Sequence, residues 1–314
     1  MSQAVDLSTQ PADDVARAGQ PHDMGGFVAG TLVHTEDGLK PIEQIKVGDR
    51  VLSRHESGEG ELCYQPVTQT FQYEDRELYY VSWQVLDKET LKPKQIRGEM
   101  AVTGAHPIWV RRVVEERMDA ECVDLEETPH EINRWMSIEE IYLWYWKAYW
   151  DFEWNRGKGG GANVYVELAD GPALFGYIQP ILQSDDPDVG VGFDDEIQWL
   201  RNADTEGCRV DFRSEEGVPR NGLSSSEYGT LDNDRVAAML IDDLQEAYDH
   251  PDALNFTKRS GGYLPMRRRV YNLEVANTHT YFVGDLGLWV HDSSVLSCTQ
   301  IRRSPRINPE HLDG

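Results

Sequence analysis

The chain has 314 residues, enough for one large domain or two ordinary ones with a substantial buried core. Hydrophobic residues make up 39% of the sequence and aromatic residues 10%, which is typical of a folded protein and not of a disordered one. There are 30 Lys and Arg residues against 55 Asp and Glu, a formal net charge of −25 at pH 7. Phosphate backbones and anionic lipid surfaces repel such a chain, so we expect no nucleic-acid partner.

Cysteine spacing and hydropathy exclude two further classes. Four cysteines are present and none forms a CxxC pair, which is too sparse for a disulfide scaffold or a Cys-rich zinc site and fits a reducing compartment. Residues 1–21 are polar and lack the apolar stretch of a signal peptide. The most apolar run, 141–154, is too short to cross a bilayer and contains Lys147 and Asp151, so we expect no membrane span.

The N-terminal part of the chain predicts strands. Residues 1–24 are small, polar and acidic, and indicate a flexible arm. An apolar, β-branched run over 27–35 is followed by Asp37-Gly38, a strong hairpin signal. Residues 39–45 predict a short turn or helix, and 47–53 a strand entered through Gly48-Asp49.

Three more strands are expected in the first half of the chain. Residues 66–73 and 77–85 alternate as strands do, and 100–110 predicts a strand interrupted by Pro107.

From about Val114 the strand pattern gives way to a helical one. Ser137 followed by Glu140 is a capping box, which predicts a helix from 138 towards 154.

One face of that predicted helix is aromatic, with residues recurring every four positions: Tyr142, Trp146, Trp150 and Trp154. Such a stripe packs into a core or docks against a partner, and the sequence leaves both open. Beyond it, 164–181 predicts a hairpin around Asp170-Gly171, and 184–195 an acidic loop. Residues 204–233 show no period and predict a loop, whereas 236–248 predicts an amphipathic helix.

The strand pattern returns at the C-terminal end. Residues 269–275 and 281–283 predict strands, and a turn at 284–287 leads into a last strand, 288–291. After Asp292 the chain becomes polar and contains Pro305 and Pro309.

Three separated segments can be considered together. The run 26–33 opens the β-rich part, Thr103 and His106 form a Thr-x-x-His motif, and 270–292 contains Val-Tyr-Asn-Leu-Glu-Val, His-Thr-Tyr-Phe-Val and a closing Val-His-Asp. The order of these segments and their short sequence motifs resemble the Hint (hedgehog/intein) family, and most of all the pretoxin Hint domains of bacterial polymorphic toxins. The resemblance is good over 26–112 and 266–292 and loose over 135–195.

The resemblance implies a mainly β, intein-like horseshoe of strands whose two ends meet, with a mixed α/β acidic insertion. The corresponding division of the chain has five parts: an N-terminal arm (1–24), the first half of the Hint domain (25–114), an insertion with a β extension and two helices (115–265), the C-terminal Hint strands (266–292) and a polar tail (293–314).

At the N-terminal junction of active relatives, a first-residue Cys attacks the carbonyl that precedes it, and the Thr and His of Thr-x-x-His hydrogen-bond the scissile amide. The resemblance gives these last roles to Thr103 and His106. The nucleophile position is Gly26, which has no side chain, so the acyl shift and splicing are expected to be absent. Asn272 occupies a position that often carries Asp.

At the C-terminal junction of such relatives, a terminal Asn cyclises while two histidines polarise its carbonyl and move a proton. Here the histidines correspond to His279 and His291, the Asn position is Asp292, and Ser293 begins the downstream segment. An ionised carboxylate closes the ring poorly, so we expect at most slow cleavage between Asp292 and Ser293.

The expected function is therefore a single-turnover self-cleaving module of a polymorphic-toxin-type protein, with its own chain as substrate and no cofactor. One alternative is a catalytically dead Hint fold that binds a toxin, immunity, chaperone or secretion-apparatus protein. A minor alternative is a metal site at His279, His291 and Asp292, although we assign no metal. The resemblance implies a location in the bacterial cytoplasm. It also allows export as part of a toxin by a secretion system that needs no signal peptide.

Overall fold

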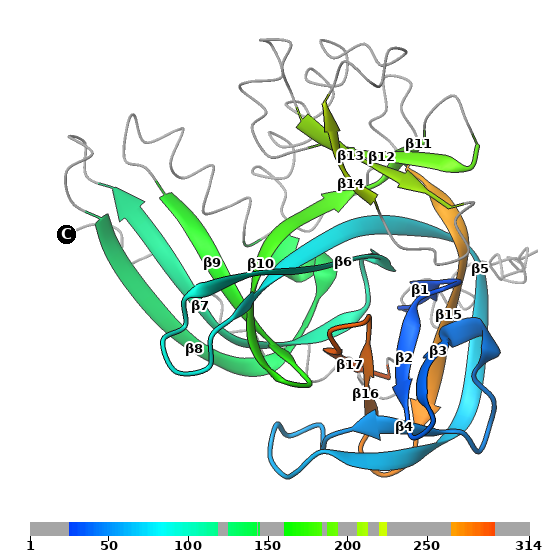
Figure 1. The fold of residues 1–314 in the computed structure, drawn as a ribbon. Coiled ribbons are helices and arrows are strands. Elements are labelled where there is room, and N and C mark those ends of the chain that lie inside the picture. Colours follow the sequence, from blue (N-terminus) through cyan, green and yellow to red (C-terminus); the bar gives the residue numbers. More distant parts are fainter. Residues whose placement is uncertain are drawn as a thin grey trace, which may run out of the picture.

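The computed structural model describes residues 25–118, 125–142, 144, 160–183, 187–193, 206–212, 220–224 and 265–292. These residues are mainly β, as the sequence predicts, and most of their strands join one 13-stranded, antiparallel sheet that bends back on itself (Figure 1). The predicted arm (1–24), tail (293–314) and amphipathic helix (236–248) lie outside the described residues. Within the described part of the chain, no helix has the length and apolarity needed to cross a membrane.

The first strands follow the turn signals of the sequence. Gly38 has φ 106°, a conformation that favours glycine, and it closes the predicted hairpin with the register pair Thr35↔Gly38. The predicted turn or helix at 39–45 is the 3₁₀ helix η2 (Ile42–Gln44). The strands are β1 (Phe27–Val28), β2 (Leu32–Thr35), β3 (Gly38–Pro41) and β4 (Arg50–Ser53).

The two strands predicted at 66–73 and 77–85 are one strand, β5 (Cys63–Leu86), with a positive φ of 56° at Asp75. Its first half pairs with β4 and its second half with β6 (Pro93–Thr103), so one strand connects two parts of the sheet. The predicted strand at 100–110 is in fact two strands, β6 and β7 (Pro107–Met118), because a turn at 104–106 separates them.

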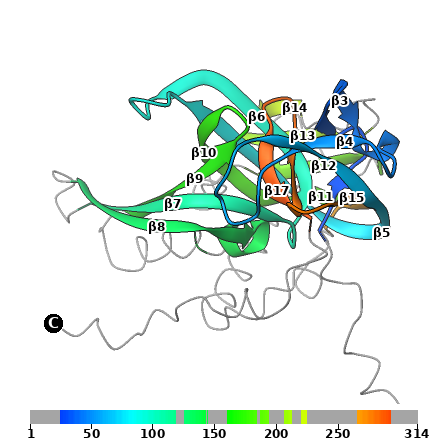
Figure 2. The ribbon, with the colours of Figure 1, turned by 90° about the horizontal axis from the view of Figure 1, so that it is seen from below.

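Strand β7 pairs with β8 (Leu125–Ser137) and β9 (Gly160–Leu168), and these three extend away from the rest of the sheet (Figure 2). The hairpin predicted around Asp170-Gly171 is present: β9 pairs with β10 (Gly171–Pro180), and Gly171 has φ 124°.

After β8, residues 138–142 are helical. One hydrogen bond of the capping box is present, because the Glu140 N–H donates to Ser137 Oγ at 3.1 Å; the Glu140 carboxylate pairs with Arg134 at 2.7 Å. Tyr142, the first member of the predicted aromatic stripe, is buried with its ring 5.8 Å from that of Tyr79. The other three members of the stripe lie outside the described residues.

A second sheet corrects two loop predictions. It comprises β11 (Leu182–Gln183), β12 (Val189–Phe193), β13 (Glu206–Asp211) and β14 (Arg220–Ser224) in sequential antiparallel order. The residues 184–195 and 204–233 were expected to be loops, which is wrong for the strands they contain. Apolar residues do alternate with glycine or charged residues in β12 and β13, but each run is only five or six residues long and is flanked by acidic residues typical of loops.

The C-terminal strands form where they are predicted: β15 (Arg267–Val275), β16 (Thr280–Val283) and β17 (Leu288–His291). β15 pairs with β1, and β16 pairs with β2, so the two ends of the described chain lie together in the sheet (Figure 1). The large side chains that are almost fully buried in this region are Phe27, Tyr281, Phe282 and Trp289. This packing fixes the places of the two predicted junctions.

Candidate functional site

Thr103 and Asn272 hold the backbone at the peptide bond between Gly25 and Gly26 with three hydrogen bonds. The Gly26 N–H donates to Thr103 Oγ1 at 2.9 Å, and the Gly26 carbonyl accepts from the Thr103 N–H at 3.0 Å. The Gly25 carbonyl accepts from Asn272 Nδ2 at 3.1 Å. Thr103 therefore contacts the amide that the resemblance assigns to it, and Asn272 places a hydrogen-bond donor on the carbonyl.

The orientation of the Asn272 side chain follows from its other contacts. Its Oδ1 accepts from the Leu273 N–H at 2.8 Å and from the Tyr281 hydroxyl at 2.6 Å. With the oxygen held by two donors, the amide nitrogen faces Gly25. An aspartate here would place an oxygen against the Gly25 carbonyl, so the amide suits this contact better than a carboxylate would.

His106 lies against Gly25 without hydrogen-bonding it. The ring is fully buried, packs edge-on against Phe27 at 4.2 Å, and has no hydrogen-bond partner at either nitrogen among the described residues. Burial, and secondarily the charge of His291, lower the pKa of His106 to about 3. The ring is therefore neutral at physiological pH, and the hydrogen bond predicted for it is made by Thr103 alone.

The space around this junction is shaped for glycine. A Cβ on Gly26 would lie 2.9 Å from the Tyr271 carbonyl oxygen and 2.9 Å from Val270 Cγ2. A Cβ on Gly25 would lie 2.6 Å from both Cα and Nδ1 of His106. Any side chain at either position requires the neighbouring strand or the turn at 104–106 to shift.

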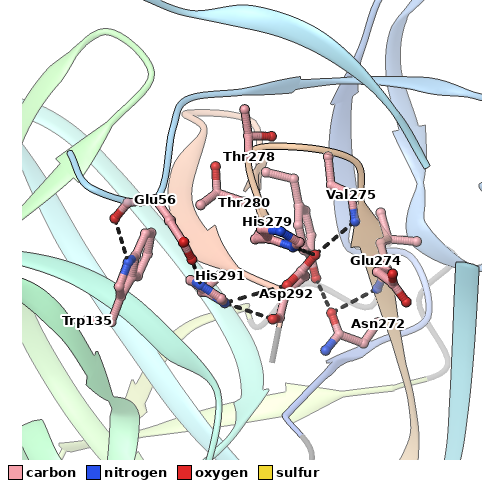
Figure 3. Close-up of polar contacts among 12 residues, drawn as sticks. Glu56, Trp135, Asn272, Glu274, Val275, Thr278, His279, Thr280, His291 and Asp292 are labelled. Atoms are coloured by element: carbon pink, nitrogen blue, oxygen red, sulfur yellow. Dashed lines mark hydrogen bonds and ion pairs between the residues drawn. The ribbon is translucent and has the colours of Figure 1, made fainter. Parts of the chain in front are cut away.

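The C-terminal junction begins at the end of β17. His291 Nδ1 lies 2.7 Å from the carbonyl oxygen of Asp292, which belongs to the peptide bond that joins Asp292 to Ser293 (Figure 3). The His291 ring is 1% exposed and Asp292 is 0% exposed, so this contact is shielded from water. A donor in a dry site polarises a carbonyl more strongly than it would in solvent.

The Asp292 carboxylate lies among one backbone donor and two imidazoles. Oδ2 accepts from the Val275 N–H at 2.9 Å and lies 3.5 Å from His279 Nδ1, while Oδ1 lies 3.6 Å from His291 Nδ1 (Figure 3). Burial raises the pKa of Asp292, and the backbone hydrogen bond and the two imidazoles oppose that rise. The acid form is thus accessible at a higher pH than for a free aspartate.

His279 reaches this carboxylate from a strained turn. Its φ of 56° is unusual for a residue with a side chain, and its carbonyl accepts from the Asp292 N–H at 2.8 Å. Ser53 secures the turn, because its Oγ lies 2.6 Å from both Thr278 Oγ1 and the Thr280 carbonyl oxygen. The two histidines singled out in the sequence are therefore both brought to Asp292.

Glu56 is a site residue that the sequence does not reveal. Its Oε2 lies 3.0 Å from His291 Nε2, and its backbone carbonyl accepts from Trp135 Nε1 at 2.9 Å (Figure 3). Glu56 sits in a polar loop between β4 and β5 that carries no motif. Only the fold brings this loop to the end of β17.

One strand contacts both junctions. On β15, Asn272 contacts Gly25 and Val275 contacts Asp292. A strand rises about 3.3 Å per residue, so these two contact points lie roughly 10 Å apart. Among the described residues no group of three or more His, Cys, Asp or Glu side chains is arranged to hold a metal ion, so the metal alternative gains no support.

Residues 32–109 match the family model of the pretoxin Hint domain, which confirms the predicted resemblance. Similar solved structures include an intein-like domain from Clostridium thermocellum (15% identity, 85% of this chain and 99% of that chain covered, TM-score 0.36). Another is a DnaB intein from Synechocystis sp. (8% identity, 85% and 98% covered, TM-score 0.37). A search of curated proteins found no match.

Proposed function

We propose that this Hint domain cleaves its own chain between Asp292 and Ser293, slowly and once per molecule. The observation that carries the proposal is the 2.7 Å contact between His291 Nδ1 and the Asp292 carbonyl oxygen. This contact polarises the carbonyl whose carbon must be attacked, while the Asp292 carboxyl group is the nearest nucleophile in the same residue.

The proposed reaction needs no external reagent except water. An oxygen of the Asp292 carboxyl group attacks the Asp292 carbonyl carbon, a five-membered cyclic anhydride forms, and the bond from that carbon to the Ser293 nitrogen breaks. The leaving nitrogen takes up a proton from the histidine pair, and a proton lost by the carboxyl group restores the balance. Water then opens the anhydride to a C-terminal aspartate.

Two features make this reaction slow. The Asp292 carboxylate closes a ring onto the carbonyl carbon less readily than the carboxamide of Asn does. Its Oδ2 is also held by a hydrogen bond from the Val275 N–H. At the other end of the site, Gly26 provides no thiol or hydroxyl, so we propose that neither the acyl shift nor splicing occurs.

The same carboxylate contacts favour a second candidate function. A fully buried Asp292 that accepts from Val275 ties the end of β17 to β15, as a purely structural group would. In that case the domain is a binding module for a toxin, immunity, chaperone or secretion-apparatus protein. We further propose a bacterial polymorphic-toxin context, with the protein in the cytoplasm or exported with its toxin, and the pretoxin match supports this context.

Intact-mass measurement separates the two functions. Purified protein and D292N are incubated for days at mildly acidic and neutral pH, and loss of residues 293–314 is followed. We expect slow loss from the native chain and faster loss from D292N, because the neutral carboxamide closes the ring more readily.

In the D292N background, H279A and H291A should suppress the loss. H130A is the matched control, since His130 is partly exposed and pairs with Glu115 away from the site. Loss of the tail at equal rates in all four proteins would assign the cutting to a contaminating protease and favour the structural function.

A further inference from the structure

The edge of the His291 ring that points away from the peptide bond carries Nε2, and this nitrogen contacts an acidic side chain. Glu56 Oε2 lies 3.0 Å from Nε2, while Nδ1 of the same ring lies 2.7 Å from the Asp292 carbonyl oxygen. Both partners accept hydrogen bonds, so a ring with a proton on each nitrogen satisfies both of them. A neutral ring satisfies one of them and leaves the other without a donor.

We propose that Glu56 is a positioning residue of the C-terminal junction: its carboxylate accepts the hydrogen bond from Nε2–H of His291 and so holds the ring with Nδ1–H directed at the Asp292 carbonyl. The inference rests on the proposed self-cleavage, and adds to it the group that orients the general acid. Glu56 does not touch the reacting atoms, so it acts only through His291.

The loop that carries Glu56 is fixed by aromatic packing. Trp135 donates from Nε1 to the Glu56 carbonyl at 2.9 Å, and its ring lies edge-on to that of His291 with centroids 5.0 Å apart. Two residues further on, a Cβ at Gly58 would lie 2.6 Å from the Trp109 ring, so the backbone of the loop is seated directly on that ring. Trp135 therefore contacts both Glu56 and His291 and fixes their positions relative to each other.

Exposure suggests how protons reach the site. The side chain of Glu56 is 38% exposed, whereas that of His291 is 1% exposed and that of Asp292 is 0% exposed. When His291 gives a proton to the leaving nitrogen of Ser293, water at the Glu56 carboxylate can return one to the ring. The acid thus connects a buried imidazole to solvent.

The first test measures cleavage in the D292N background. E56Q keeps an oxygen acceptor for Nε2 but removes the charge, and it should slow loss of residues 293–314 by at least about tenfold, within the range that acid–base groups contribute. The matched control is E59Q, an exposed acid of the same loop, which should cleave at the parent rate. Thermal unfolding midpoints confirm that both variants stay folded. Equal rates for E56Q and its parent would overturn the proposal.

The second test does not depend on cleavage. In ¹⁵N-histidine-labelled native protein, the Nε2–H proton of His291 should resonate far downfield because it is bonded to a carboxylate; H291A assigns the signal. We expect E56Q to move or abolish this resonance and E59Q to preserve it. If D292N itself never cleaves, the proposed function fails while this measurement still decides the role of Glu56. An unchanged resonance in E56Q contradicts the proposal.

Discussion

At the residue scale, two hydrogen-bonding side chains and a buried imidazole surround the peptide bond between Gly25 and Gly26. Thr103 and Asn272 bind the N–H and the C=O of the Gly25–Gly26 region, and His106 packs against it. Thr103 and His106 could be singled out from their motif. The consequences of the burial of His106 could not be predicted. Among the described residues neither nitrogen of the enclosed His106 ring has a hydrogen-bond partner, and Phe27 and Tyr281 pack around the ring, which keeps it neutral.

Burial of His106 makes the fold sensitive to acid. Its pKa falls from 6.5 to about 3 on folding, so between these values the unfolded state binds more protons than the folded state. Above pH 6.5 His106 is neutral in both states and does not lower the free energy of unfolding. Below pH 6.5 the free energy of unfolding decreases as the pH falls, by up to about 1.4 kcal/mol per pH unit. Urea unfolding at several pH values should show this slope in the native protein.

The variant H106F should flatten that slope, since no titrating group remains in the cavity. H130F is its control, because His130 is partly exposed, and it should keep the native slope. An unchanged slope in H106F would show that other groups cause the acid sensitivity.

Steric fit at Gly26 gives a second prediction at this scale. G26A should lower the free energy of unfolding by about 1–3 kcal/mol, because its Cβ would press on the Tyr271 carbonyl and the Val270 side chain. G176A is the control: neither Gly26 nor Gly176 has a left-handed φ, and a Cβ at Gly176, in β10, would meet Ser82 Oγ at 3.2 Å. Denaturant unfolding measures both. If G26A is as stable as G176A, the junction has room for a side chain and the glycine is not required.

At the scale of elements, the turn between β15 and β16 positions His279. Its residues take unusual conformations, with φ of 65° at Asn277 and 56° at His279, and Ser53 on β4 holds them by bonding Thr278 and Thr280. The strands on either side could be predicted from alternation, but this bracing could not, because Ser53 is more than two hundred residues away in sequence.

Removing the brace should loosen the turn. S53A leaves the Thr278 hydroxyl and the Thr280 carbonyl with one partner fewer in a buried setting, at a cost of about 1–3 kcal/mol in unfolding free energy. In the D292N background it should also slow cleavage, since His279 loses its fixed position. S57A, on the exposed part of the next loop, should change neither quantity. A stable, fully active S53A would show that the turn holds itself.

Three strands show the limits of predicting secondary structure from hydrophobic alternation. Strands β12 and β13 are short alternating runs in acidic stretches of the sequence that were expected to form loops, yet they pair through their backbones. β5 is the opposite case: its alternation is clear on both sides of Asp75, but only the structure shows that the chain continues through this residue as one strand. Backbone pairing over long sequence distances decides both cases, and no local pattern records it.

At the scale of the whole molecule, β15 brings the two ends of the domain together. Asn272 and Val275 contact the two junctions from one strand, and the β1–β15 and β2–β16 pairings close the structure around them. The sequence predicts the strands and the residues with motifs, His279 and His291 among them. It does not predict Glu56, because a single acid in a polar loop acquires its role only when the loop packs on the tryptophans near β17.

The most direct test of the account is the mass of the fragment that D292N releases. Ring closure by the asparagine that this substitution introduces breaks the bond to Ser293 and leaves a cyclic imide. At early times residues 1–292 should therefore appear lighter by one water molecule than the open chain, and should gain that water on longer incubation. A folded D292N that stays intact for days, or that yields a fragment of full hydrolysed mass from the first time point, would contradict intramolecular cleavage at this junction.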